Sequence, residues 1–432
     1  MKKLLLAFFI LCTTSVAQDN HQKPPTLWLT VFLHGGGLHP AYFSISDFFS
    51  VIHDRADQTV YARTTHLLRH DPFFFQVQPM GFPGLHRAYP SKEIKTGANI
   101  FGMLQQRVHK LITPDIPRTL YYSYGWEGIL SRNARRRAAR RLYLELVARV
   151  EYFKKMGYCP KIRLIGYSHG GNVLLLMGEE ARNHPIGTLT IDELVLISTP
   201  IQRGTQTYVT SPLFKKIFLL YSIGDRIQST DFLSAPKNLF TSHTFVNRKG
   251  FVVPKKVTQV QVRFIRKSIK VRNKDGSIKI FHHRDVMNPN HTEMFFFGWT
   301  PEWYRRYLPI RPLPVGAFTP LITQTIDTLH LDGNHVLVTI IPEEEKMIIK
   351  NRADNQSYTT HFITQNQLTT LQKELWRYKP KGFEKSSQFH KYYRARMKRA
   401  LHQAQREAAL EKKSRKAAQK SLPQARRARS AS

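Results

Sequence analysis

Short apolar runs alternate with helical patterns through the first three hundred residues of this 432-residue chain. Five of these runs are expected to be strands, at residues 26–34, 119–124, 161–167, 194–198 and 217–223. Continuous apolar strands separated by helices are typical of a mostly parallel sheet, because such a sheet is covered on both faces. The pattern therefore predicts an α/β fold with helices flanking the sheet.

A long helix is expected between the second and third of these strands. Leu142, Leu146, Val150 and Phe153 recur at helical spacing on one face, and Gly157 ends the pattern. Six arginines also fall between positions 132 and 141. Such a cluster can contact nucleic acid, but we interpret it as a solvated helix face.

The pattern becomes irregular after residue 225. Residues 257–283 predict a hairpin that turns at Asp275 and Gly276, and a second hairpin-like unit is expected around Asp332 and Gly333. The proline-rich stretch 308–316 has the composition of a linker. We therefore expect an α/β domain at 25–305, a small α+β extension at 306–380 and a tail at 381–432 that is either helical or disordered.

The amino-terminal segment has the pattern of a signal peptide. Lys2 and Lys3 precede an apolar run, and the small residues Ser15 and Ala17 offer a cleavage site, so residues 1–17 are expected to be removed on export. The predicted location is periplasmic, secreted or surface-associated. Only Cys159 then remains in the mature chain, which excludes an intrachain disulfide and favours a buried, inert thiol.

Positive charge is in large excess and is concentrated near the carboxyl terminus. The chain has 66 Lys and Arg against 30 Asp and Glu, a net charge of +36. Residues 381–432 hold sixteen of the basic and three of the acidic residues, a net charge of +13. This basic tail is expected to favour an anionic membrane or nucleic acid as a partner.

The sequence "GYSHGGN" places a serine in a tight turn between an expected strand and an expected helix. Gly166 and Gly170 stand two positions either side of Ser168, where such a turn has little room for side chains. The turn exposes the hydroxyl near the helix amino terminus, whose N–H groups favour developing negative charge. Ser168 is therefore a candidate nucleophile.

A second glycine-rich stretch, "HGGG", follows the first expected strand. Glycines allow backbone N–H groups to approach a substrate oxygen without hindrance. An oxyanion hole would combine the His169 N–H with that of Gly35 or Gly36. The alternative is an ordinary turn after a strand.

A nucleophilic serine needs a histidine to accept its proton and a carboxylate to orient that histidine. Asp225 follows the fifth expected strand and is the candidate acid, with Asp231 as the alternative. His291, in the loop sequence "MNPNHTEMFFF", is the candidate base. The alternatives for the base are His282 and His283, which end an expected strand, and then His243.

The motifs "HGGG", "GYSHGG", "SIGD" and "NHTEMF", in this order, resemble those of the α/β-hydrolase superfamily, especially its lipase and esterase branch. The resemblance covers about residues 25–305. It implies Ser168 as nucleophile, Asp225 as acid and His291 as base. The basic tail has no counterpart in the family pattern.

The predicted function is that of an exported serine hydrolase that cleaves a small-molecule or lipid ester through an acyl-enzyme. An acyltransferase would use the same residues. The alternative from another class is a non-catalytic binding protein on a hydrolase scaffold. No metal or cofactor is expected, because the histidines lack ligand spacing and the glycines do not form a dinucleotide or phosphate-binding motif.

Overall fold

The computed structural model describes most of the chain from residue 24 onward. The described residues are 24–36, 50, 53–56, 59–89, 96–113, 117–183, 189–229, 241–272, 278–299, 304–305, 308–383 and 385–429. The expected signal peptide at 1–17 lies outside them.

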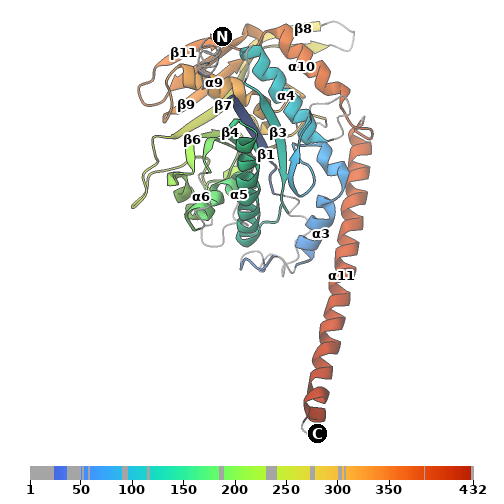
Figure 1. Cartoon of the computed structure of the whole chain (residues 1–432). Coiled ribbons are helices and arrows are strands. Elements are labelled where there is room, and N and C mark those ends of the chain that lie inside the picture. The colour runs from blue at the N-terminus through green and yellow to red at the C-terminus, as the bar shows by residue number, and fades with distance from the viewer. Residues whose placement is uncertain are drawn as a thin grey trace, which may run out of the picture.

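An 11-stranded open sheet runs through the described part of the chain, and helices cover both faces (Figure 1). The strand order is β11-β10-β9-β7-β6-β5-β4-β1-β3-β2, with β8 paired to β7. The central strands from β3 to β9 are parallel, whereas β2, β8, β10 and β11 pair in antiparallel fashion. The predicted α/β class with a mostly parallel sheet is confirmed.

The strands have the following bounds: β1 Thr26–Leu33, β2 Gly84–Arg87, β3 Thr119–Gly125, β4 Cys159–Tyr167, β5 Ile191–Ile197, β6 Phe214–Tyr221, β7 Val257–Arg272, β8 Ile278–Met287, β9 His335–Ile341, β10 Lys346–Asn351 and β11 Ser357–His361. All five apolar runs that were expected to be strands form strands. Their central residues are buried on both sides, which explains why they read as continuous apolar runs.

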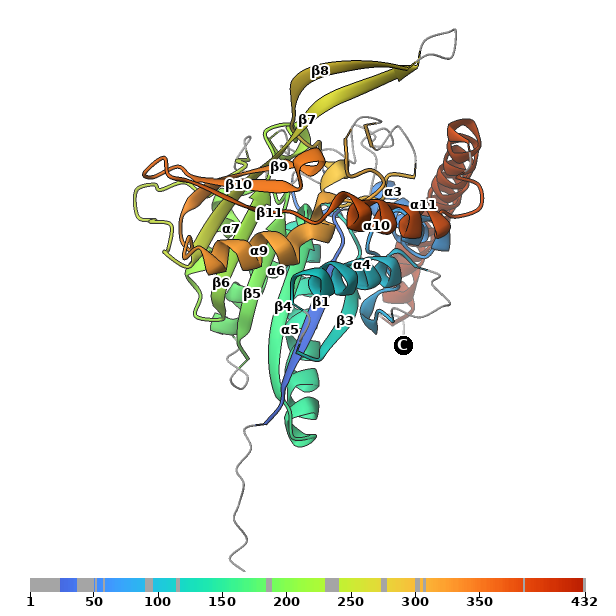
Figure 2. The ribbon, with the colours of Figure 1, turned by 90° about the horizontal axis from the view of Figure 1, so that it is seen from above.

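The helices have the following bounds: α3 Val60–Arg69, α4 Gly97–Ile112, α5 Arg132–Lys155, α6 His169–Asn183, α7 Arg203–Gln206, α8 Arg226–Ser229, α9 Thr319–Thr328, α10 Gln365–Arg377 and α11 Ser386–Arg429. Helices α4, α9 and α10 cover one face of the sheet, and α5 and α6 cover the other (Figure 2). The apolar stripe predicted for α5 is confirmed, because Leu142, Leu146, Val150 and Phe153 are all buried.

The carboxyl-terminal third continues this sheet. Strand β9 pairs in parallel with β7, and β10 and β11 extend the edge. The proline-rich stretch that was expected to be a linker instead packs in the core, where Leu308, Ile310, Leu313 and Val315 are buried. Its spaced apolar side chains, rather than its prolines, determine its position.

Two other local predictions need correction. The hairpin of β7 and β8 is confirmed, although its turn at Asp275 and Gly276 lies outside the described residues. Asp332 and Gly333 instead connect α9 to β9, and the second hairpin is formed by β9 and β10. Cys159 is exposed rather than buried, because it lies at the first position of β4.

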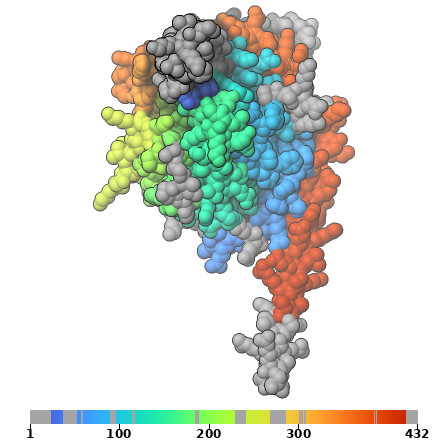
Figure 3. All heavy atoms as spheres, viewed as in Figure 1, coloured from blue at the N-terminus to red at the C-terminus, as the bar shows by residue number. Residues whose placement is uncertain are grey.

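The basic tail is a helix in its described part. Helix α11 begins beside the sheet domain, runs along α3 and extends well beyond the body of the molecule (Figures 1 and 3). Phe389 at its start stacks on Phe73 of the short 3₁₀ helix η3 (Pro72–Gln76). The tail is therefore docked on the domain at one end.

Candidate active site

Ser168 lies in a strained turn between β4 and α6. Its φ is +51°, a left-handed conformation that is uncommon for a residue other than glycine. The turn is also closely packed: a Cβ on Gly166 would lie 2.9 Å from the backbone of Gly171, and one on Gly170 would overlap the carbonyl oxygen of His34. The glycines either side of Ser168 are thus required by packing, as the sequence predicted.

The structure brings Ser168, His291 and Asp225 together from segments far apart in the chain. His291 Nε2 lies 3.0 Å from Ser168 Oγ, and His291 Nδ1 lies 2.8 Å from Asp225 Oδ2. Strands β4 and β6 are parallel members of one sheet, so Ser168 and Asp225 both follow its carboxyl edge. These distances are those of a nucleophile, a base and an orienting carboxylate.

Asp225 is fully buried and its carboxylate is held at both oxygens. Oδ2 contacts His291, and Oδ1 accepts the backbone N–H of Gln228 at 3.0 Å. Burial raises the pKa of this carboxyl, but the nearby His291 and the hydrogen bonds outweigh it, so the pKa lies below its ordinary value. Asp225 is therefore ionised at neutral pH and accepts a hydrogen bond from the Nδ1–H of the ring.

The loop at residues 288–293, called the histidine loop below, is fixed from several sides. Buried Glu293 accepts the N–H of Asn290 at 2.7 Å, and the Tyr167 hydroxyl donates to the carbonyl of His291 at 3.0 Å. A Cβ on Gly224 would overlap the carbonyl oxygen of Asn288. The candidate acid and the candidate base are thus carried by two loops in direct contact.

The glycine-rich stretch after β1 lies against the serine. A Cβ on Gly35 would lie 3.0 Å from Ser168 Cβ, and one on Gly36 would lie 3.1 Å from the ring of His169. Neither Gly35 nor Gly36 donates its N–H to another residue within the described ranges. The residues predicted to form an oxyanion hole are therefore adjacent to Ser168.

His34 fixes the start of this stretch. Its ring stacks on Trp126, accepts the Trp126 backbone N–H at 3.3 Å, and donates from Nδ1 to the Gly35 carbonyl at 2.7 Å. The Trp126 indole in turn donates to the carbonyl of His34 at 2.9 Å. Burial, assisted by the Arg69 guanidinium, lowers the pKa of His34 well below its ordinary value, so the ring is neutral.

A buried arginine lies behind the serine. Arg135 of α5 is 1% exposed, and its Nη1 lies 2.9 Å from Nδ1 of His169. A guanidinium can only donate, so the His169 ring accepts at Nδ1 and carries its proton on Nε2. The interpretation of residues 132–141 as a solvated face is therefore wrong at Arg135.

The alternative candidates take other positions. His243 donates from Nε2 to the backbone carbonyl of Asp225 at 2.8 Å, so it supports the acid without contacting Ser168. His282 and His283 lie in β8, and their side chains are outside the described part. Asp231 also lies outside the described residues.

Three contributors were not anticipated from the sequence: Arg135, Tyr167 and Glu293. Arg135 precedes the buried residues Ala138 and Leu142 by three and seven positions, which is helical spacing and could have identified it. Tyr167 acts through a contact between distant segments, for which no local signal exists, whereas Glu293 accepts the N–H of Asn290, three residues before it.

Within the described ranges, no group of three or more His, Cys, Asp or Glu could hold a metal ion. No helix in the same part of the chain is long and apolar enough to cross a membrane. Comparison with protein families finds no family model that matches the chain, and comparison with characterised proteins finds no significant match.

Proposed function

We propose that this protein is a serine hydrolase of the α/β-hydrolase type that cleaves a carboxylic ester through an acyl-enzyme. The observation that carries the proposal is the continuous hydrogen-bonded chain from Ser168 through His291 to Asp225. A serine hydroxyl is a poor nucleophile, and this arrangement is the one that activates it.

In the first half of the reaction, Ser168 Oγ attacks the ester carbonyl carbon while His291 Nε2 accepts the hydroxyl proton. Asp225 accepts the Nδ1–H bond throughout and stabilises the imidazolium. The protonated ring then gives its proton to the departing alcohol, which leaves an ester of Ser168 with the acyl group. Water, deprotonated by the same ring, releases the acid and restores the serine.

The carbonyl oxygen becomes negative in each tetrahedral intermediate. The backbone N–H groups of Gly35 or Gly36 and of His169 are the proposed donors to it, at the amino terminus of α6. The strained φ of Ser168 supports this assignment, because the turn holds the hydroxyl close to those donors.

Labelling with a fluorophosphonate probe tests the proposal. Wild-type protein should form a covalent adduct, and Ser168→Ala should not, since the probe reacts with activated serines. Thr205→Ala is a matched control, because it removes a buried hydroxyl that contacts Asn172 rather than His291. Folded wild-type protein that fails to react would refute the proposal, and labelling that survives in Ser168→Ala would place the nucleophile elsewhere.

A further inference from the structure

Helix α11 is held on the domain by one face of its first half. Phe389, Met397, Ala400 and Ala404 are buried at helical spacing, and α3 packs against this face. Two ion pairs reinforce the contact: Arg396 with Asp71 at 3.0 Å, and Glu411 with Arg63. The helix is therefore a fixed arm, whose last part extends beyond the body (Figure 1).

The face opposite this contact is basic. Lys391, Lys398, His402 and Arg406 each lie two residues from a buried position, a rotation of about 200° around the helix. All four are exposed, and Lys413 and Lys416 continue the same face. The basic stripe, defined as Lys391, Lys398, His402, Arg406, Lys413 and Lys416, spans 25 residue steps, or about 38 Å at the rise of an α-helix.

The stripe is not neutralised by its own chain. Within the described ranges, no carboxylate forms an ion pair with a lysine or arginine of the stripe. Of the two nearby acids on α11, Glu411 pairs with Arg63 and Arg415, and Glu407 accepts from Gln403 at 3.0 Å. The cations therefore present an uncompensated charge to a partner.

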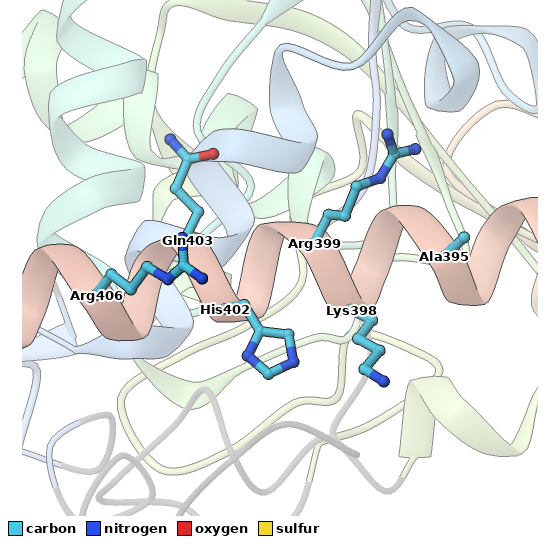
Figure 4. Close-up of a pocket in the computed structure, with 6 residues that line it drawn as sticks. All are labelled: Ala395, Lys398, Arg399, His402, Gln403 and Arg406. Carbon is cyan, nitrogen blue, oxygen red and sulfur yellow. The ribbon is translucent and has the colours of Figure 1, made fainter.

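The stripe also borders a surface hollow of about 760 Å³. Its described lining consists of α11 residues, and Figure 4 shows their side chains extending on both sides of the helix. Five of the six lining side chains are basic or amide, namely Lys398, Arg399, His402, Gln403 and Arg406, and the sixth is Ala395. The N–H groups of these side chains can donate hydrogen bonds to the oxygens of a phosphate chain.

Two polyanions could meet this charge, and the helix favours one. A helix that binds a membrane surface inserts an apolar face into the lipid boundary, but the apolar face of α11 is already packed against the domain. Its exposed large apolar side chains in the described part are only Tyr392 and Leu410. A projecting helix about 10–12 Å across instead fits the major groove of a duplex, which is about 12 Å wide.

We propose that α11 is a binding arm for double-stranded nucleic acid, and that its basic stripe contacts the phosphates without reading the base sequence. A stripe of about 38 Å matches about 11 base pairs at 3.4 Å per step. The inference does not depend on the proposed hydrolase activity.

The test compares two full-length variants that lose the same charge. The arm variant carries Lys398→Gln, Arg406→Gln, Lys413→Gln and Lys416→Gln, and glutamine preserves helix propensity. The control variant carries Lys154→Gln, Lys155→Gln, Lys249→Gln and Lys255→Gln, at exposed sites away from α11. Circular dichroism checks that both variants retain the helical content of the wild type.

Binding is measured by fluorescence anisotropy with a 20-base-pair duplex of arbitrary sequence over 50–200 mM salt. Each lost phosphate contact should reduce the slope of log K against log salt by about 1, so the arm variant should lose about 3–4 in slope. Its affinity at 100 mM salt should fall more than tenfold, whereas that of the control should change less than threefold. Equal losses in both variants would overturn the proposal in favour of a general charge effect.

The same variants are then tested for binding to vesicles of phosphatidylcholine with phosphatidylserine. If the four α11 substitutions abolish vesicle binding while duplex binding is absent or unchanged, the partner is a membrane and the proposal is wrong. Selective loss of duplex binding would support it.

Discussion

Replacing Asp225 with asparagine should abolish the proposed hydrolase activity by reversing one hydrogen bond. The two oxygens of Asp225 have different partners: Oδ1 accepts the Gln228 backbone N–H at 3.0 Å, and Oδ2 accepts His291 Nδ1–H at 2.8 Å. The Gln228 N–H can only donate, so the asparagine oxygen must take the Oδ1 position. The amide nitrogen then faces His291 and donates to Nδ1.

This exchange moves the imidazole proton to Nε2. In the wild type, the Nε2 lone pair faces Ser168 Oγ at 3.0 Å and can accept the hydroxyl proton. In Asp225→Asn, His291 Nε2 and Ser168 Oγ both carry hydrogen, so the ring cannot accept the serine proton. Loss of the correct tautomer in such a triad lowers kcat about 10⁴-fold, which corresponds to about 5.4 kcal/mol of activation free energy.

The assay is kcat/KM for a short-chain 4-nitrophenyl ester, together with the rate of fluorophosphonate labelling. Asp192→Asn is the control, because Asp192 also accepts a backbone N–H, from Ile162 at 2.9 Å, but lies in β5 near its start. The control should retain the wild-type rate. A folded Asp225→Asn protein within tenfold of wild-type activity would refute the tautomer argument.

Three further predictions concern the surroundings of the site. Gly224→Ala should push the histidine loop away from the acid and lower kcat about 10²-fold. Gly204→Ala is the control, because its Cβ would meet only the flexible Arg132 side chain, at 3.9 Å, so kcat should not change. A rate equal to wild type in both variants would contradict the packing argument. Arg135→Met should leave the buried His169 Nδ1 without its arginine donor and lower the free energy of unfolding in urea by about 1–3 kcal/mol. The control Arg140→Met, at an exposed site, should change it by no more than about 0.5 kcal/mol. Equal effects would count against the contact between Arg135 and His169. Folding lowers the pKa of Asp225 below 3.8, so its ionised form adds stability above about pH 3.8, and this stability is lost as the pH falls through the folded pKa. The difference in unfolding free energy between wild type and Asp225→Asn should therefore shrink between pH 6 and pH 3. A constant difference would show that the fold does not stabilise the carboxylate.

Much of this arrangement was predictable from local pattern and chain order. The central strands are buried on both faces and so read as apolar runs, and the turn around Ser168 needs glycines for reasons visible in the sequence. Asp225 and His291 were predicted because they follow the serine in the chain order serine, acid, histidine that accompanies such a turn in α/β-hydrolases. These features depend on neighbouring residues or on their order.

Features that depend on tertiary packing were harder to predict. The stretch 308–316 has many prolines, yet its apolar side chains fill the core, so composition was a poor guide to its position. Gly333 does form a turn, with φ of +76°, but the turn joins a helix to a strand, because the preceding Leu321, Ile322 and Ile326 have helical spacing. The side chains around His291 come from several distant segments and could not be assigned without the structure.

The proposed mechanism requires that Ser168 carries the acyl group during turnover. Rapid quenching of the wild-type protein with a slowly deacylating 4-nitrophenyl ester, followed by mass spectrometry of its peptides, tests this most directly. The wild-type protein should release a burst of one 4-nitrophenolate per active molecule and carry an acyl mass increment on Ser168, and Ser168→Ala should show neither. An increment on another residue, or ester turnover with no covalent adduct in the folded protein, would contradict it.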